Sequence, residues 1–213
     1  MKNIVFVGPP GSGKGTQAKK LGNHLKLPVF STGDILRQEV EEKSRIGEKV
    51  KDLMKEGKFV PNRIVNKIIF EMLKENGPGF ILDGYPRNEK QAKAITKFFR
   101  KKEWELVVFE FVLDDKIAVE RISGRRTCSC GHVYHLKYNP PKVDEICDEC
   151  GKKLVERNDQ RPEVVKQRLK TYNQITKPLI EYLKEQDKIK VIYHLIEADE
   201  QIDEIQKNIM SKI

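Results

Sequence analysis

The sequence predicts an α/β fold in which a parallel β-sheet lies between two layers of helices. Short apolar runs alternate with helical stretches along the chain, which is the pattern of βα units. Several of the runs are almost continuously apolar, as expected for strands covered on both faces. A glycine-rich loop follows the first run directly. The five predicted strands are residues 3–7, 28–30, 79–83, 106–113 and 189–196.

The first predicted strand leads into a loop of the phosphate-binding type. Residues 8–16 have the sequence GPPGSGKGT, in which Gly8, Gly13 and Lys14 satisfy the pattern G-x-x-x-x-G-K. Apolar residues at helical spacing follow the loop, namely Ala18, Leu21, Leu25 and Leu27. The order of strand, glycine turn and helix is the context that this motif requires.

The residue types in this loop suit a phosphate. Glycines let the backbone turn several N–H groups inward, and the N-terminus of the next helix adds partial positive charge. Lys14 would add a full charge at the β- and γ-phosphates. Residue 15 is Gly where the general motif has Ser or Thr, so a hydroxyl appears only at Thr16. We therefore expect a nucleoside phosphate here, rather than a glycine-rich turn that binds nothing.

Two stretches interrupt the alternation of strands and helices. Residues 31–60 look entirely helical, whereas residues 122–160 contain all four cysteines, Pro140 and Pro141 and little helical periodicity. Both stretches are interpreted as insertions into an α/β core. The predicted core consists of residues 1–30, 61–121 and 161–213.

A helix is predicted to begin directly after the second insertion. Residues 159–163 place Pro162 near its first turn, where proline is favoured. Arg168 then lies one or two turns from the helix start. The predicted apolar face consists of Val164, Val165, Leu169, Tyr172 and Ile175. A last helix is predicted near residues 200–212.

The predicted strand at residues 79–83 ends in a carboxylate, Asp83. An aspartate at the end of an apolar strand beside a phosphate-binding loop holds Mg²⁺, directly or through water. Because Gly84 follows, Asp83 could instead only form a turn. The neighbouring loop favours the magnesium interpretation.

Arginines lie near the ends of several predicted elements. The tight turn at residues 84–87 is expected to present Arg87 to the same crevice as the phosphate-binding loop. Phosphoryl transfer needs positioning, positive charge and exclusion of water, and the guanidinium fork matches phosphate oxygens. Seven further arginines are candidates for the same role, namely Arg37, Arg121, Arg125, Arg126, Arg157, Arg161 and Arg168. For each arginine, the alternative is an exposed surface position without a part in the reaction.

The cysteines form two close pairs, each followed by a glycine. One residue separates Cys128 from Cys130, two separate Cys147 from Cys150, and sixteen lie between the pairs. This spacing predicts a structural Cys₄ zinc site, although C-x-C departs from the usual C-x-x-C. Four unrelated thiols are the alternative, and disulfides are not expected in a cytosolic chain. The histidines of the same loop that could compete as ligands are His132 and His135.

Composition excludes several classes of protein. Of the 213 residues, 34% are charged and 38% hydrophobic, which is typical of a soluble globular chain. No apolar stretch approaches the ~20 residues of a membrane span, and the four-residue apolar run near the N-terminus is too short for a signal peptide. A cytoplasmic protein is therefore expected. The net charge of +9 would suit polyanions or small phosphates, but the basic residues are scattered.

Taken together, these motifs resemble those of the adenylate kinase family, in its long form with a zinc-bearing lid. The resemblance runs from residue 1 to about residue 205, with the motifs in family order. The motifs are GPPGSGKGT (8–16), STGDILR (31–37), GKFVP (57–61), DGYPR with Gln91 (83–91), GRR (124–126) and the R-x-D of Arg157 and Asp159. Gly15 also fits, because the family carries Gly-Lys-Gly-Thr at this place.

The resemblance implies a three-layer P-loop nucleoside monophosphate kinase fold with a parallel five-stranded sheet. Residues 31–60 would be the helical AMP-binding insertion, and residues 122–160 the zinc-stapled lid. It further implies reversible transfer from Mg·ATP to AMP, giving two ADP. The mechanism would combine in-line positioning, a Lys/Arg charge clamp, Mg²⁺ and lid closure, with a structural Zn²⁺ on the four cysteines.

The resemblance also assigns roles to single residues. Those implied to bind ATP are Gly11, Ser12, Gly13, Lys14, Gly15, Thr16, Arg125, Val133, Tyr134 and, as a backbone contact, Glu200. Those implied to bind AMP are Thr32, Arg37, Lys58, Phe59, Val60, Gly84, Tyr85, Pro86, Arg87, Gln91, Arg157 and Arg168. The implied catalytic residues are Lys14, Arg87, Arg125, Arg157, Asp159 and Arg168. Asp83 is the residue associated with magnesium.

Two other functions stay open at this point. A kinase for UMP or CMP is the closer alternative, although Thr32 and Gln91 favour adenine by resemblance. A nucleic-acid-binding zinc ATPase is disfavoured, because Tyr134 and Tyr138 are the only aromatic residues of the cysteine loop and no basic stripe accompanies them. We therefore expect a monomer with ATP, AMP and ADP as small-molecule substrates, and neither nucleic acid nor membrane as a partner.

Overall fold

Five parallel strands form the centre of the protein, in the order β2-β3-β1-β4-β7. The computed structural model describes residues 2–213, apart from the side chain of Asn158. The strands are β1 (Asn3–Val7), β2 (Val29–Ser31), β3 (Phe80–Asp83), β4 (Leu106–Val112) and β7 (Val191–Glu197). The five predicted strands are thus confirmed, with ends shifted by one or two residues.

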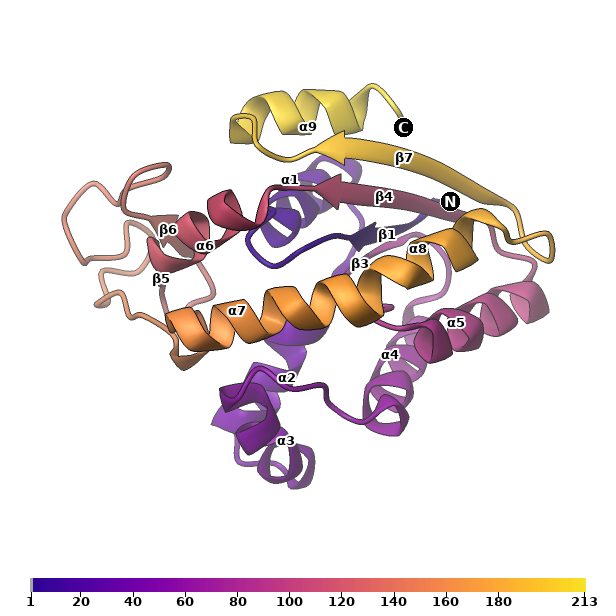
Figure 1. Cartoon of the computed structure of the whole chain (residues 1–213), viewed down its shortest axis with the longest axis horizontal. Coiled ribbons are helices and arrows are strands. Elements are labelled where there is room, and N and C mark those ends of the chain that lie inside the picture. The colour runs from indigo at the N-terminus through magenta and orange to yellow at the C-terminus, as the bar shows by residue number, and fades with distance from the viewer. Residues whose placement is uncertain (1) are drawn as a thin grey trace.

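Helices cover both faces of this sheet (Figure 1). They are α1 (Lys14–Leu25), α2 (Thr32–Glu41), α3 (Arg45–Lys55), α4 (Asn62–Asn76), α5 (Glu89–Lys102), α6 (Asp115–Ser123), α7 (Pro162–Thr171), α8 (Lys177–Lys184) and α9 (Ile202–Met210). The α/β fold with a five-stranded parallel sheet is therefore as predicted. None of the described helices has the length and apolar character needed to cross a bilayer.

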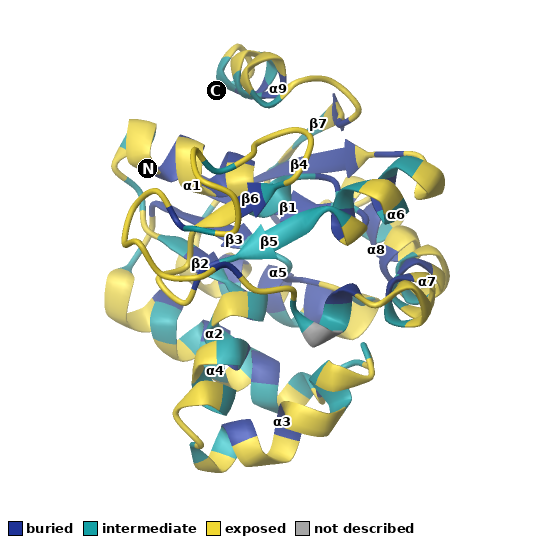
Figure 2. Cartoon of the chain, turned by 90° about the vertical axis from the view of Figure 1, so that its left-hand side faces the viewer, coloured by how far each residue is buried: buried dark blue, intermediate teal, exposed yellow. Residues whose placement is uncertain are grey.

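Alternate residues of the central strand serve the two layers. Ile4 and Phe6 of β1 pack in one apolar cluster with α1, α6, α7 and α9, whereas Val5 and Val7 pack in another with α4, α5 and α8. All four side chains are almost completely buried. Because both faces are covered, β1 needs the continuous apolar sequence that predicted it. Figure 2 shows the buried strands near the centre, with more exposed helices around them.

The chain path makes β1 the turning point of the sheet. β3 lies on one side of β1 and β4 on the other, so the connections leave in opposite directions. In such sheets a crevice opens at the carboxyl ends of the strands beside the turning point. The loop after β1 lies at this place, and the strand ends in Figure 1 point toward the hairpin of β5 (Arg125–Thr127) and β6 (Val133–His135).

The two predicted insertions differ in structure. Residues 31–60 hold α2 and α3, which pack against each other so closely that a Cβ on Gly47 would lie 2.0 Å from the backbone oxygen of Glu39. Residues 122–160 hold the β5–β6 hairpin, loops and the short 3₁₀ turn η1 (Asn158–Gln160). The helical nature of the first stretch and the irregular nature of the second were both predicted.

One prediction for the helix that follows residues 122–160 is wrong. Val165 and Leu169 are buried as predicted, but Ile175 is 42% exposed, whereas its neighbour Thr176 is buried. At about 100° per residue, Thr176 lies almost directly in line with Val165, while Ile175 lies about 80° away from it. The chain continues from α7 into α8 through a π-helical turn, η2 (Tyr172–Thr176).

Candidate active site

The loop after β1 fits into a narrow space at the sheet edge. A Cβ on Gly8 would lie 2.7 Å from the backbone oxygen of Phe111 in β4, so no larger residue can occupy this position without moving the strand. The hydroxyl of Ser12 is buried and donates to the backbone oxygen of Pro9 at 2.9 Å. The loop is therefore held in shape by its own contacts.

Lys14 begins α1, and its ammonium group folds back over the loop. Its Nζ donates to the backbone oxygen of Pro9 at 2.7 Å and to Oγ of Ser12 at 3.0 Å. Burial lowers the pKa of Lys14 to about 7; Asp83 opposes this shift, and the charges of Arg87, Arg168 and Arg125 add to it. An anion at the loop would restore the charge of this lysine.

Asp83, the last residue of β3, lies directly beside the loop. Its Oδ2 accepts a hydrogen bond from Oγ of Ser31 at 3.3 Å, and a Cβ on Gly15 would lie 3.2 Å from the same Oδ2. Glycine at position 15, where the general motif has Ser or Thr, therefore lets the carboxylate lie close to the start of α1. This close approach is the physical reason for the departure seen in the sequence.

An ion-paired cluster lies where the second insertion returns to the core. Asp159 accepts from Nε of Arg157 at 3.0 Å and from Nη1 of Arg168 at 2.9 Å. Burial alone would raise the pKa of Asp159, but the charges of Arg168, Arg157, Arg37 and Arg125 hold it below its usual value. The carboxylate therefore fixes two guanidiniums that belong to different elements.

Two further guanidiniums lie within electrostatic range of this cluster. Burial lowers the pKa of Arg125 on β5, and the charges of Arg157 and Arg168 lower it further, although a guanidinium remains protonated. Burial likewise lowers the pKa of Arg87, whose Nε donates to the backbone oxygen of Gly84 at 2.7 Å. The structure thus places Arg37, Arg87, Arg125, Arg157 and Arg168 in one electrostatic group with Lys14.

The other predicted arginine candidates lie elsewhere. Arg121 donates to the backbone oxygens of Ala198 and Asp199 and thereby connects α6 to the loop before α9. Arg126 donates to the backbone oxygen of Ser123, and Arg161 is exposed at the start of α7. Arg161 is therefore an exposed surface residue, whereas Arg121 and Arg126 have structural roles.

Several residues that the resemblance assigns to AMP lie around α2 and α4. The Thr32 hydroxyl is buried without a hydrogen-bond partner among the described residues. It lies beside closely packed apolar side chains, which belong to Ile35, Leu36, Val65, Ile68 and Ile69. Arg37 pairs with Asp34, and the exposed Lys58 pairs with Glu56 at 2.6 Å.

Gln91 is almost fully buried at 1% exposure, and its amide is engaged by the protein. Its Oε1 accepts from the backbone N–H of Arg87 at 2.7 Å, and its Nε2 donates to Oδ1 of Asn62 at 3.0 Å. The hydroxyl of Thr176, in the π-helical turn, donates to the backbone oxygen of Arg87 at 2.8 Å. Tyr85 is also fully buried, with its hydroxyl donating to Oδ1 of Asn66. Gln91 and Thr176 therefore fix the backbone from which Arg87 extends.

Two residues that the resemblance assigns to ATP, Val133 and Tyr134, lie on β6. Val133 is exposed, whereas the buried Tyr134 packs with the cysteines, and its hydroxyl accepts from the backbone N–H of Asp148 at 2.9 Å. The side chain of Tyr134 therefore supports the cysteine loop. At the other end of the chain, the backbone oxygen of Glu200 accepts from Arg121 at 3.4 Å.

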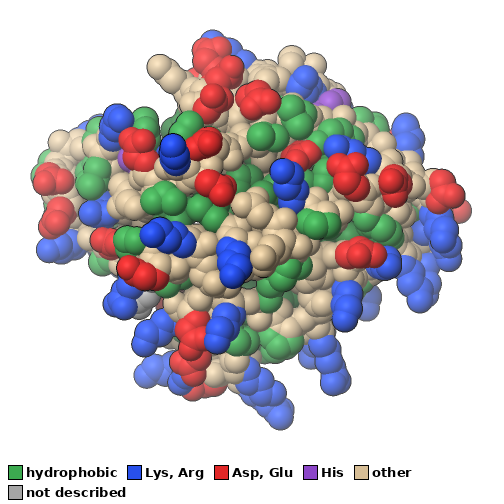
Figure 3. Space-filling model, in the orientation of Figure 1, with side chains coloured by type: hydrophobic (Ala, Val, Ile, Leu, Met, Phe, Trp, Pro, Cys, Tyr) green, Lys and Arg blue, Asp and Glu red, His purple; other side chains and the backbone are tan. Residues whose placement is uncertain are grey.

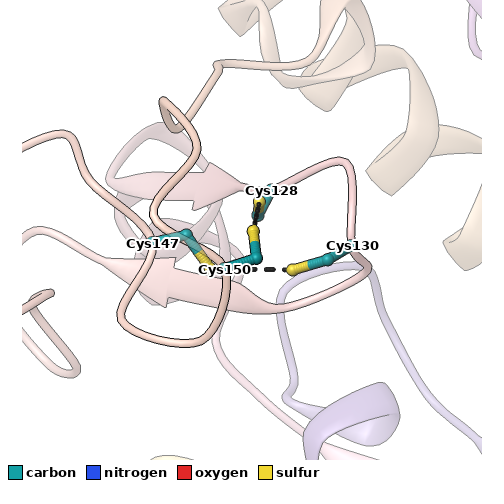
Figure 4. A group of neighbouring side chains, drawn as sticks. All are labelled: Cys128, Cys130, Cys147 and Cys150. Carbon is teal, nitrogen blue, oxygen red and sulfur yellow. Dashed lines mark hydrogen bonds between the residues drawn. The ribbon is translucent and has the colours of Figure 1, made fainter.

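The four cysteines gather at the tips of two turns and point toward one another (Figure 4). Their Sγ atoms all lie within 4.8 Å of one another, with Cys128 and Cys150 at 3.3 Å and Cys130 and Cys147 at 3.6 Å. Four thiolates bound tetrahedrally at ~2.3 Å from zinc would be separated by similar distances. The donor set therefore fits zinc, and the C-x-C spacing does not prevent the cluster from forming.

Sequence reasoning missed Gln160, which is 1% exposed beside the arginine cluster. Its side chain binds the backbone of Ile122 and Arg125 near the start of residues 122–160 and that of Arg157 near their end. No pattern in the sequence marks this residue, because a polar residue in an irregular segment is normally exposed.

These observations define a class of protein. A phosphate-binding loop on the central strand, an aspartate on the neighbouring strand and a group of guanidiniums at the same sheet edge are typical of P-loop kinases that act on nucleoside phosphates. A family model described as adenylate kinase matches residues 6–188.

Similar proteins lead to the same family. The chain is 43% identical to an adenylate kinase of Thermosipho melanesiensis, over 95% of this chain and 97% of that protein. It is 40% identical to one of Caldanaerobacter subterraneus, over 97% and 93%, and 43% identical to one of Methanosarcina barkeri, over 96% of both chains. The chain belongs to the adenylate kinase family.

Proposed function

We propose that the protein transfers a phosphoryl group reversibly from Mg·ATP to AMP and so forms two ADP. The observation that carries this proposal is the gathering of Lys14, Arg87, Arg125, Arg157 and Arg168 at the edge where the phosphate-binding loop lies. Phosphoryl transfer depends on positioning and on positive charge around the transferred group. Membership of the adenylate kinase family supports the same reaction.

In this proposal the two nucleotides approach from opposite sides of the arginine cluster. The backbone of residues 11–16 and Lys14 hold the phosphates of ATP. Arg125, Val133 and Tyr134 contact ATP from the lid, and the backbone of Glu200 contacts it from the core. Arg87, Arg157 and Arg168 hold the phosphates that are exchanged. Asp159, which binds both Arg157 and Arg168, keeps those two forks in place. Asp83 would hold Mg²⁺, which supplies charge neutralisation between the phosphates when it is bound.

AMP would occupy the space between α2, α4 and the turn at residues 84–87. The unpartnered hydroxyl of Thr32 would hydrogen-bond to the base, and the ring surface of the base would pack against the neighbouring apolar side chains of Ile35 and Ile68. Arg37 and Lys58 to Val60 would contact the rest of the nucleotide. Gln91 would act at this site together with Arg87, whose backbone it holds.

Both insertions would cover the reaction and exclude water. We propose residues 31–60 as the AMP-binding domain, residues 122–160 as the lid, and the remaining segments as the core. In support, Nζ of Lys19 on α1 donates to the backbone oxygen of Gly131 in the lid loop at 2.8 Å. A Cβ on Gly57 would lie 2.9 Å from Val164 on α7. Both insertions therefore contact core helices, and exclusion of water would prevent hydrolysis of ATP.

A structural zinc ion would hold the lid together through Cys128, Cys130, Cys147 and Cys150. The four thiolates complete a tetrahedral set, so no position would remain for catalysis by the metal. The apolar cluster of this region contains only Tyr134 and Leu154 besides two of the cysteines, among the described residues. Such a small core needs an additional link.

Small nucleotides, rather than nucleic acid or a membrane, are the proposed partners of a monomeric, cytoplasmic enzyme. On the face drawn in Figure 3, Lys and Arg side chains are interspersed with Asp and Glu, without a continuous basic stripe. A nucleic-acid-binding surface would require such a stripe.

The proposal is tested with purified protein, Mg·ATP and each of AMP, GMP, CMP and UMP. We expect nucleoside diphosphate formation with AMP and little with the other three. Lys14→Met serves as the inactive control. Turnover that favours CMP or UMP would overturn the choice of substrate, and ATP hydrolysis without an acceptor would overturn phosphoryl transfer to a nucleotide.

A further inference from the structure

Gln160 lies at the junction where the proposed lid leaves and re-enters the core. It is the last residue of η1, directly before the segment that leads into α7. Its side chain is 1% exposed, which is unusual for a glutamine and requires that its polar atoms be satisfied inside the protein.

The side-chain amide of Gln160 binds both segments of this junction. On the segment that leaves the core, its Nε2 donates to the backbone oxygen of Ile122, at the end of α6, at 2.9 Å and to that of Arg125 on β5 at 3.0 Å. On the segment that returns, its Oε1 accepts from the backbone N–H of Arg157, directly before η1, at 2.7 Å. Both donors and the acceptor of one amide are thus used to connect the two segments.

Two of the backbone groups that Gln160 binds belong to arginines of the active site. Arg125 lies on β5 and Arg157 directly before η1, yet both are proposed to contact phosphates. Because Gln160 binds the backbone of each, it sets the distance between the two points from which the guanidiniums extend. A misplacement of about 1 Å at such a site can lower the rate on the order of a hundredfold.

We propose that Gln160 is a positioning residue for phosphoryl transfer, which connects the two segments that join the proposed lid to the core and so holds Arg125 and Arg157 in one arrangement. This inference rests on the proposed function, because it assigns no contact with substrate to Gln160 itself. It acts through the two arginines whose backbone it binds.

The chemistry of the amide makes the inference specific. A carboxylate at this position could accept from the N–H of Arg157, but it would also place an oxygen against the two backbone oxygens of Ile122 and Arg125. A methionine would fill the same space without any of the three hydrogen bonds. Gln160→Glu therefore breaks the hydrogen bonds to Ile122 and Arg125, and Gln160→Met breaks these two and the one to Arg157.

The test compares wild type, Gln160→Glu, Gln160→Met and a control, Gln167→Glu. Gln167 is exposed on α7 and makes the same change of charge away from the junction. The readouts are the single-turnover rate of ADP formation, the KM for AMP and the Tm. We expect both Gln160 variants to lose on the order of tenfold to a hundredfold in single-turnover rate, with a KM for AMP close to that of wild type.

A purely structural role would lower the Tm without lowering the rate selectively. A lower single-turnover rate with an unchanged KM for AMP therefore distinguishes a positioning role from a structural one. Single-turnover rates of both Gln160 variants within twofold of the Gln167→Glu control would overturn the positioning role while leaving the function in place. A loss of the same size in kcat/KM that arises only from a higher KM, with kcat unchanged, would also overturn it. A wild-type protein that forms no ADP from AMP would instead overturn the proposed function, and this inference with it.

Discussion

Gly15 at the start of α1 and Asp83 at the end of β3 are so close that a Cβ on residue 15 would lie 3.2 Å from Oδ2 of the carboxylate. This approach leads to a prediction in which stability and activity change in opposite directions. Gly15→Ala is expected to maintain or raise the Tm, because alanine is favoured over glycine within a helix by about 1 kcal/mol. It is also expected to lower kcat, because Asp83 must move away from the loop.

The measurement is a pair of thermal unfolding and steady-state assays on Gly15→Ala and Asp83→Asn. Asp83→Asn should lower the activity without affecting helix propensity, and it serves as the comparison. A Gly15→Ala protein with wild-type kcat would show that the tight approach has no part in catalysis.

Replacement of Arg168 by lysine should be far from conservative. The guanidinium donates through Nη1 to the backbone oxygen and to Oδ2 of Asp159, which leaves Nη2 for a phosphate. The single ammonium nitrogen of a lysine cannot serve both partners in the same geometry. We expect Arg168→Lys to lower kcat by about a hundredfold or more, a magnitude typical of lost transition-state contacts. Arg161→Lys, on the exposed start of the same helix, is the control and should keep full activity. Equal kcat values in the two variants would remove Arg168 from the mechanism.

The lowered pKa of Lys14 predicts proton uptake when ATP binds. In the free protein, burial lowers the pKa of Lys14 to about 7, so the amine is increasingly neutral above this pH. Bound phosphates would restore the charge, and the affinity for ATP should therefore fall as the pH rises from 7.5 to 9. Calorimetry in buffers of different ionisation enthalpy measures the uptake. It should disappear in Lys14→Met, and uptake that persists there would assign the proton to another group.

The same pKa has a consequence for the free protein. Between pH 7 and the ordinary lysine pKa of 10.5, the unfolded chain binds more protons at this residue than the folded chain does. The contribution of Lys14 to the free energy of unfolding therefore rises with pH across this window. Lys14→Met should flatten this part of the stability profile measured by denaturant unfolding.

Zinc is expected to be bound at about one ion per chain and to stabilise the lid. Removal by a strong chelator should lower both the Tm and the kcat, and added Zn²⁺ should restore them where Mg²⁺ does not. Cys147→Ser should lose the metal, whereas Ser129→Ala, between the cysteines of the first pair, should retain it. Metal-free protein with four rapidly reacting thiols and full activity would contradict this expectation.

The parts of the structure that the sequence predicts are those governed by local rules. The continuous apolar runs predicted all five strands, and the glycine loop predicted the start of α1, because each pattern depends on residues near to one another. The cysteine pairs likewise predicted a cluster that the structure brings together. The spacing of the cysteines predicted this cluster because each pair lies on a single turn, and only two turns have to come together.

The parts that escaped prediction depend on contacts between distant segments. Arg121 and Arg168 look alike in sequence, but one binds the loop before α9 and the other Asp159. The amide of Gln91 binds Asn62, and that of Gln160 binds the backbone of Arg125. Neither contact follows from the pattern of residues nearby in the sequence. Convergence of side chains is set by the tertiary path of the chain, which periodicity does not describe.

The π-helical turn at Tyr172–Thr176 joins α7 and α8 into one long rod (Figure 1). Ahead of it, α7 carries Arg168, which binds Asp159, and behind it Leu179, Ile180 and Leu183 of α8 pack in the apolar cluster against the sheet. A π-helical turn holds one residue more than an α-helical turn, so deletion of one residue would leave a regular helix. The hydroxyl of Thr176 would then lose its place against the backbone oxygen of Arg87, so the length of this turn helps to fix an arginine that lies far from it in the sequence.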